Sequence, residues 1–232
     1  MGLIENAAGR VVPTEVNGRE STPFAGVGKH RPNGRKAAPT IASCIDYPAD
    51  GDKRVGSIRE ALEHVGLTDG MVVSSHHHLR NGDAVANLVF DAAADLGRRD
   101  LMWFPSASFP VHANQLRHLD NGVIHHIEGS MNGPLGAYCS TGRMRGLGVL
   151  RSHGGRWQAI QDGEVHIDVA VIAAPTADAF GNATGDRGPA GCGLLGVALA
   201  DSVYAEKVSV VTVHLVPVPG LPWQSQGTSV AR

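Results

Sequence analysis

The chain has 232 residues, of which 42% are hydrophobic and 18% are charged, a composition typical of one large globular α/β domain or two small ones. Its formal net charge is −2, from 20 basic and 22 acidic residues, so charge gives no reason to expect nucleic acid or an anionic membrane as a partner. No run of about 18 apolar residues occurs, and the N-terminus carries no apolar signal segment, so we expect neither a transmembrane helix nor a secretory signal.

The cysteines point to a reducing compartment. Cys44, Cys139 and Cys192 are odd in number and widely separated, unlike a disulfide framework. We therefore expect a cytoplasmic protein. Neither Cys139 nor Cys192 has a partner residue at a spacing typical of a catalytic thiol, so a small packed side chain is the simpler interpretation of each.

Residues 1–50 have little hydrophobic periodicity and are interrupted by five prolines, Pro13, Pro23, Pro32, Pro39 and Pro48. This pattern predicts an irregular, extended N-terminal arm without its own core. Regular structure is expected from Ser57, which stands three residues before Glu60 in a capping-box pattern and opens a helix over 57–67.

From there the chain alternates between predicted strands and helices. A short strand over 71–75 leads into a loop, and Asp83 is placed to cap a helix over 84–97 that Gly97 ends. The other predicted strands are 101–106, 123–129, 149–153, 166–175 and 208–215, and the other predicted helices are 112–120, 134–142 and a short one near 202–207. This alternation predicts βαβ units and a mostly parallel sheet. We expect an α/β domain over 51–216 and a proline-rich linker or tail over 217–232.

The segment SSHHHLRNGD, residues 74–83, follows a predicted strand, where parallel sheets bind ligands. Three interpretations are open: a metal site shared with His125, His126 or His153, a loop satisfied by the backbone, or a loop whose imidazoles, Arg80 and N–H groups bind an anion. No metal-ligand spacing supports the first, so we expect no metal.

Two further polar segments are candidates. Residues 168–185 predict a buried strand leading into a turn with Asp178, Gly181 and Asn182, which could equally be a structural turn. SHGGR, residues 152–156, predicts a second glycine-bearing loop, in which Arg156 could pair with a carboxylate. No nucleophile elbow, P-loop or dinucleotide-binding motif is present.

Read in order, the histidine segment, GPLG at 133–136, RSHGGR at 151–156 and the strand into FGNATG at 180–185 resemble the alpha subunit of citrate lyase, a citrate CoA-transferase. The resemblance extends over nearly all of the chain, to residue 222. It implies a CoA-transferase-like α/β fold, an open, mostly parallel sheet with helices on both faces, of which this chain is the N-terminal half.

The resemblance also implies an activity and partners. Such a subunit exchanges the acetyl group on an acyl-carrier thiol for citrate, and a beta subunit then cleaves the citryl thioester to oxaloacetate. The implied partners are the beta subunit, the acyl carrier (gamma) subunit and a C-terminal half, in an oligomer. No cofactor is expected to be tightly bound, because the CoA-like phosphopantetheine thioester belongs to the carrier.

By the same resemblance, the first loop and its neighbours bind the thioester and citrate. Arg80 and Arg156 are the leading carboxylate partners by charge and position. The nucleophilic glutamate, which would form a mixed anhydride and then a glutamyl thioester, is expected in the C-terminal half, and Glu128 is the one weak candidate here. The predicted binding residues are His76, His77, His78, Arg80, Gly82, Asp83, His153, Gly154, Gly155, Arg156, Asp178, Gly181 and Asn182.

Two alternatives stay open. Ser130, Met131 and Asn132 stand where the family usually has Gly-Leu-Arg, and the missing arginine favours a CoA-transferase that acts on another carboxylic acid. The expected absence of the glutamate-bearing half favours a non-catalytic piece that only binds partners.

Overall fold

The structure is a computed structural model that describes residues 2–27, 50–76, 78–212, 214–217, 225–226 and 229–231. The chain divides into two compact units, Met1–Lys36 and Ala37–Arg232. No helix among the described residues has the length and apolar character needed to cross a bilayer.

The first unit contains two short hairpins where the sequence predicted an irregular arm. β1 (Leu3–Glu5) pairs antiparallel with β2 (Val11–Pro13), and β3 (Glu15–Val16) with β4 (Arg19–Glu20). The second hairpin turns at Asn17 and Gly18, both with positive φ, as the tightest hairpin turns require. Leu3 and Val11 remain mostly exposed, so the described part of this unit buries little. The rest of the predicted arm, from 28 to 49, lies outside the described residues.

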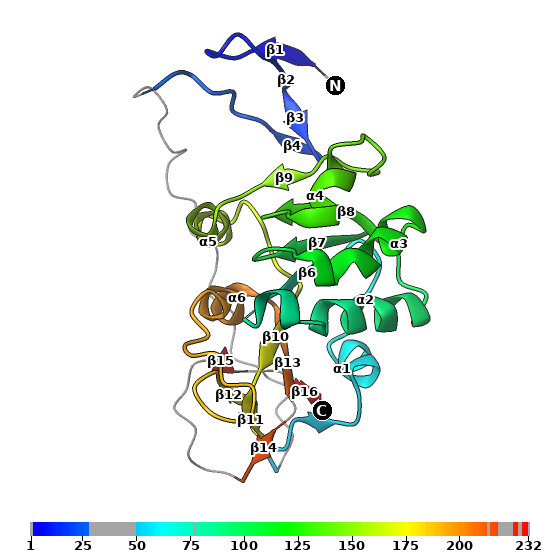
Figure 1. Cartoon of the computed structure of the whole chain (residues 1–232), viewed down its shortest axis with the longest axis vertical. Helices are drawn as coiled ribbons and strands as arrows, with labels where there is room; N and C mark the ends of the chain where they lie inside the picture. Colours follow the sequence, from blue (N-terminus) through cyan, green and yellow to red (C-terminus); the bar gives the residue numbers. More distant parts are fainter. Residues whose placement is uncertain are drawn as a thin grey trace. The chain divides into compact units, whose positions relative to one another are not determined.

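The second unit is built on an eight-stranded sheet in which all the paired strands run parallel (Figure 1). This confirms the predicted α/β class. In spatial order the strands are β5 (Arg54–Val55), β16 (Ser229–Ala231), β13 (Lys207–Thr212), β10 (Val169–Ala174), β6 (Val72–Ser75), β7 (Leu101–Pro105), β8 (Ile124–Gly129) and β9 (Val149–Leu150).

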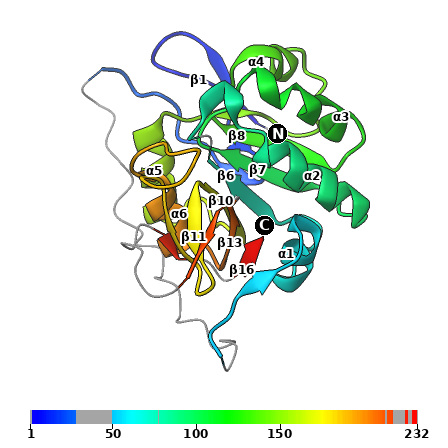
Figure 2. The same ribbon diagram turned by 60° about the horizontal axis from the view of Figure 1, so that its bottom comes forward.

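Helices cover both faces of this sheet, as predicted (Figure 2). On one face lie α1 (Ile58–His64), α2 (Val85–Asp95), α3 (Gln115–Asp120) and α4 (Gly133–Cys139), and on the other α5 (His153–Gln161) and α6 (Ala198–Tyr204). Side chains alternate between the two cores along each central strand. In β7, Leu101 and Trp103 pack in one core and Met102 and Phe104 in the other, because successive residues of a strand point to opposite faces.

A smaller sheet continues from β10. Its order is β14 (Leu215–Val216), β11 (Thr176–Asp178), β12 (Asn182–Thr184) and β15 (Ser225–Gln226), with β11 and β12 antiparallel. The segment around Asp178, predicted as a loop, is therefore a hairpin. Residues 217–232, predicted as a linker or tail, contribute β15 to this sheet and β16 to the large one.

The SHGGR segment also differs from its prediction, because it begins a helix instead of forming a loop. The hydroxyl of Ser152 accepts a hydrogen bond from the Gly155 amide at 3.0 Å, which caps α5. Ala159 and Ile160 are then buried against the sheet. The N-cap and the buried face together outweigh the low helix propensity of two glycines.

The predicted helix start at Ser57 is confirmed. Its hydroxyl accepts from the Glu60 amide at 3.1 Å, and the Glu60 carboxylate accepts from the Gly56 amide at 2.6 Å.

We expect Ser57→Ala to lower the free energy of unfolding by about 1 kcal/mol, because one amide of the first turn loses its acceptor. Urea unfolding measures this, and Ser57→Asp, which keeps an acceptor, is the control. Equal losses in the two variants would contradict the capping role.

Candidate functional site

The loops that leave β6, β7 and β8 meet at the carboxyl edge of the large sheet, because parallel strands end at the same edge. They are tied to one another by hydrogen bonds. The Ser108 hydroxyl accepts from the Asn132 amide at 3.0 Å, and the Asn132 side chain donates to the Ser108 carbonyl at 3.1 Å. The Asn81 side chain accepts from the Val111 amide at 2.8 Å. These bonds link the loops of successive strands at this edge of the sheet.

His76, the first residue after β6, is held inside the protein. Its Nε2 lies 2.7 Å from Oδ2 of Asp201 on α6. Arg156 of α5 donates to both oxygens of Asp201, at 2.8 and 2.7 Å, and to the Phe104 carbonyl at 3.0 Å. The three side chains are at most 1% exposed. The structure thus joins two predicted residues, His76 and Arg156, through a third that the sequence analysis did not identify.

Arg156 and Asp201 form a buried ion pair. Burial alone would raise the pKa of Asp201, but the positive charge of Arg156, together with His76 and the hydrogen bonds from both, holds that pKa well below its usual range. The geometry gives Arg156 a role different from the one predicted, since both terminal nitrogens of its guanidinium already donate to protein oxygens. We call His76, Arg156 and Asp201 the buried triad.

The loop beyond His76 mixes buried and exposed groups. The His78 ring stacks on His76 with 5.8 Å between centroids. Burial, and secondarily the charge of His76, lowers the pKa of His78 to about 4. Asp83 is buried and accepts from the Val85 amide at 2.9 Å, and burial raises its pKa. The N-cap of α2 is Ala84 and not Asp83 as predicted, so Asp83 lies one residue before the cap. His77 lies outside the described residues.

Arg80 and Gly82 belong to η1 (Arg80–Gly82), one turn of 3-10 helix at the exposed part of this loop. Arg80 has a φ of +52°, a left-handed conformation that costs a non-glycine residue about 1 kcal/mol or more. Its side chain is exposed. Of the two predicted carboxylate partners, Arg80 is therefore the one that faces solvent.

The other predicted residues fall into two groups. His153, Gly154 and Gly155 form the first turn of α5, where His153 and Gly154 are exposed.

The second group is the turn between β11 and β12. Oδ1 of Asp178 accepts from the amides of Phe180 and Asn182 at 3.0 Å, and Oδ2 accepts from the Asn182 side chain at 2.9 Å. Gly181 has a φ of +88°. The side chains of Asp178 and Asn182 therefore stabilise this turn.

Glu128, the weak candidate for the nucleophile, is fully buried at the end of β8. Its Oε2 accepts from Arg151 at 3.1 and 3.2 Å, and its Oε1 lies 3.6 Å from His126 Nε2. A nucleophile must reach its substrate, so this ion-paired position fits a structural role. The thiols of Cys139 and Cys192 are also poor nucleophiles, because burial raises the pKa of both. Cys44 lies outside the described residues.

Within the described ranges, one group of side chains could ligate a metal: His166, Asp168 and Glu206, whose ligand atoms lie within 4.8 Å of one another. They precede β10 and β13, at the edge of the sheet opposite the polar loops. His166 Nε2 already lies 3.0 Å from the Glu206 carboxylate, and Asp168 accepts from the Val72 amide at 2.6 Å. These hydrogen bonds explain why the three side chains lie close together without a metal ion.

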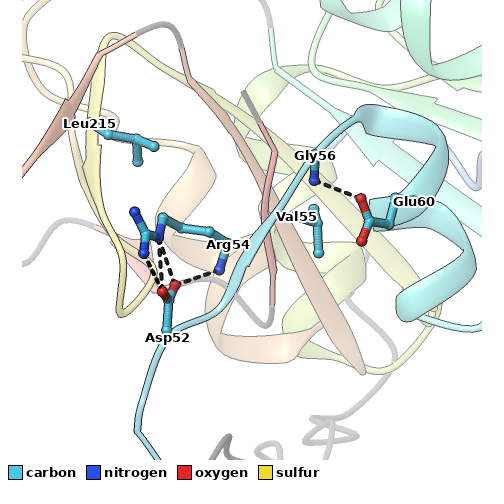
Figure 3. Close-up of a pocket in the computed structure, with 6 residues that line it drawn as sticks. All are labelled: Asp52, Arg54, Val55, Gly56, Glu60 and Leu215. Carbon is cyan, nitrogen blue, oxygen red and sulfur yellow. Dashed lines mark hydrogen bonds and ion pairs between the residues drawn. The ribbon is translucent and has the colours of Figure 1, made fainter.

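A surface depression of about 530 Å³ lies at the end of β5 (Figure 3). It is lined by Asp52, Arg54, Val55, Gly56, Glu60 and Leu215. The guanidinium of Arg54 is turned onto the Asp52 carboxylate, and this hydrogen bond lowers the pKa of Asp52 to about 2. Three strands separate β5 from β6, so this depression is not part of the loop surface.

Comparison with known proteins points to one family. Residues 51–231 match the family model described as the citrate lyase alpha subunit. The citrate lyase alpha chain of Klebsiella pneumoniae is 39% identical over 206 residues, which are 87% of this chain and 38% of that protein. That of Escherichia coli K12 is 40% identical over 171 residues, 73% of this chain and 34% of that protein. The chain thus spans well under half the length of these curated relatives.

Solved structures agree. A citrate lyase alpha subunit from Streptococcus mutans, solved in complex with citrate, superposes with a TM-score of 0.84 at 37% identity, over 98% of this chain and 44% of that one. An acyl-CoA transferase from Escherichia coli O157:H7 has a TM-score of 0.56 at 15% identity, over 84% of this chain and 48% of that one. At that identity the second match speaks for the fold alone.

The low pKa of His78 predicts a pH-dependent stability. Its pKa falls from 6.5 to about 4 on folding, so below about pH 6.5 the unfolded chain binds a proton that the folded chain does not. The folded state should therefore lose stability as the pH falls towards 4, by about 3 kcal/mol from this residue.

The measurement is the free energy of unfolding in urea between pH 7 and pH 4, for the wild type and for His78→Gln. The variant lacks the titrating ring, so its stability should fall less over this range. Parallel curves would show that His78 titrates normally in the folded chain.

Proposed function

This chain belongs to the citrate lyase alpha subunit family, and from that premise we propose that it takes part in transferring an acyl-carrier thioester from acetate to citrate. In this exchange, acetyl-carrier and citrate give citryl-carrier and acetate. The carrier thiol, borne on a phosphopantetheine arm of a separate gamma subunit, supplies the CoA-like thioester, so this chain needs no tightly bound cofactor. A beta subunit then cleaves the citryl thioester, and all three work in an oligomeric cytoplasmic complex.

The observation that carries the proposal is the loop after β6. It leaves the carboxyl end of a central parallel strand, is tied to the next loop through Asn81, and presents Arg80 in a left-handed conformation at its exposed turn. An exposed guanidinium on a turn of defined backbone conformation suits a substrate with three carboxylates. The related Streptococcus mutans protein was solved with citrate, which supports the same substrate here.

The nucleophilic glutamate of the proposed reaction is assigned to a part of the protein outside this chain. Glu128 is buried and paired with Arg151, so it supports β8 and the following loop. This chain then contributes the binding loops of the site, and the remaining length of the relatives is where we expect the nucleophile.

The test is an exchange assay in the assembled complex, with acetyl-loaded carrier and citrate, that follows the release of acetate and the formation of citryl-carrier. Isocitrate, malate and tricarballylate are run beside citrate. Release with citrate and little with the others supports the proposal. Release with another acid but not citrate would favour the second candidate, a CoA-transferase with a different acceptor, consistent with Asn132 standing where the family usually has an arginine.

We expect Arg80→Ala to raise the citrate KM by about 10- to 100-fold, because a charge-assisted hydrogen bond to a carboxylate is lost. Arg80→Gly should lose the same affinity without losing stability, since glycine adopts the left-handed backbone freely. Arg59→Ala, which removes an exposed arginine on α1, is the matched control and should leave the KM unchanged. An unchanged KM in Arg80→Ala would remove Arg80 from the citrate site.

A further inference from the structure

We propose that Asp201 is the positioning residue of the citrate-binding loop: through His76 it fixes where the loop leaves β6, and Arg156 fixes Asp201 in turn. This inference rests on the proposed function for its consequence, but its structural part can be tested without activity. Neither Asp201 nor its contact with His76 is indicated by any of the sequence motifs.

The contacts are directional and come from different elements. Asp201 lies on α6, Arg156 on α5 and His76 at the end of β6. Oδ2 of Asp201 receives two donors, Arg156 and His76, each at 2.7 Å, and Oδ1 receives the other Arg156 nitrogen at 2.8 Å. Arg156 donates to both oxygens of Asp201, which prevents the carboxylate from rotating. Oδ2 therefore faces His76 in one fixed direction.

The ionised carboxylate also sets the state of the His76 ring. A carboxylate only accepts hydrogen bonds, so Nε2 of His76 must carry the hydrogen in this pair. The ring therefore has one orientation and one protonated nitrogen towards Asp201. The His78 ring stacks on the His76 ring, so a fixed orientation of His76 also orients His78.

The loop is consequently held at both ends. At its start is the His76–Asp201 contact, and at its end Asn81 binds the Val111 amide and Asp83 binds the Val85 amide. Arg80 lies between these anchors. If the first anchor is released, the exposed turn with Arg80 is held only at one end, and the backbone from which the guanidinium reaches the substrate is no longer fixed.

Stability alone is a weak reason for such a triad. Buried ion pairs often contribute no more to folding than apolar residues of the same size, because both charges must be removed from water. The triad instead supplies what apolar packing cannot, which is a fixed direction for a polar ring at the start of the loop. The RSHGGR and SSHHHLRNGD segments are joined by this carboxylate.

The experiment compares Asp201→Asn with the wild-type chain. Histidine-ring nitrogen NMR reports the Nε2 proton of His76, hydrogen exchange reports the amides of 78–83, and the exchange assay in the assembled complex reports kcat and KM for citrate. We expect the His76 Nε2 proton signal to be lost, faster amide exchange in the loop, and a fall of about 100-fold in kcat/KM.

Asp91→Asn is the matched control. Asp91 of α2 pairs with His118 at 2.7 Å and with Arg117, both on α3. Its substitution removes another Asp–His–Arg group outside the loop, one in which Asp91 and Arg117 are partly exposed. It should change neither loop exchange nor the citrate KM. Equal effects of the two substitutions would overturn the proposal, because they would show that only general stability is involved.

A second variant covers the case in which Asp201→Asn does not fold. His76→Asn keeps the buried Arg156–Asp201 pair intact and releases only the loop anchor. It should show the same loop exchange and the same loss in kcat/KM, and where both variants fold, the double variant should lose no more than either single one.

Native loop exchange and an unchanged KM in His76→Asn would overturn the proposal. If the wild-type complex does not use citrate, the proposed function fails, while the His76 signal and loop exchange still decide the positioning role.

Discussion

The ion pair between Arg156 and Asp201 is the constraint on which the arrangement of the loops at the carboxyl edge of the sheet depends. Both side chains are almost completely buried, and an unpaired charge in that position would cost several kcal/mol. Each must therefore stay within reach of the other, and Arg156 must also stay on the Phe104 carbonyl. This requirement fixes α5 and α6 relative to β7. The same carboxylate then holds the first residue of the loop after β6.

The parallel sheet makes this arrangement possible. Its central strands are buried on both faces, so their side chains divide between two apolar cores. Polar groups are then confined to the strand ends, where the backbone leaves the sheet. At the carboxyl edge the loops bind one another through Asn81, Ser108 and Asn132. The result is a set of linked loops at the carboxyl edge of the sheet, which is where α/β proteins place their ligands.

The distribution of charge over the loop after β6 follows from the same geometry. His76 is buried against an anion, His78 is partly buried and keeps a low pKa, and Asp83 is buried beside the start of α2. Arg80 alone among these charged or titratable groups is exposed. Among the described charged or titratable groups of this loop, Arg80 is thus the exposed cation. The proposed polycarboxylate substrate rests on this arrangement, which agrees with the family to which the chain belongs.

The sequence by itself determined the local elements and the family. Alternating periodicities predicted the parallel α/β sheet, and the spacing of Ser57 and Glu60 predicted a helix start that the structure confirms. Such features depend on neighbours a few residues away, where propensity and capping act. The order of the motifs identified the family, which the family match confirms.

Only the tertiary structure decided which side chains contact one another over long sequence distances. His76 and Asp201 are 125 residues apart, and nothing in either segment indicates the other. The sequence predicted Arg156 as a substrate ligand. Its side chain is buried instead, because SHGGR begins a helix that packs on the sheet through the face that carries Arg156. Residues 229–231 join the sheet because β13 offers them a free edge. Contacts of this kind are set by how the elements pack in three dimensions, which local pattern does not encode.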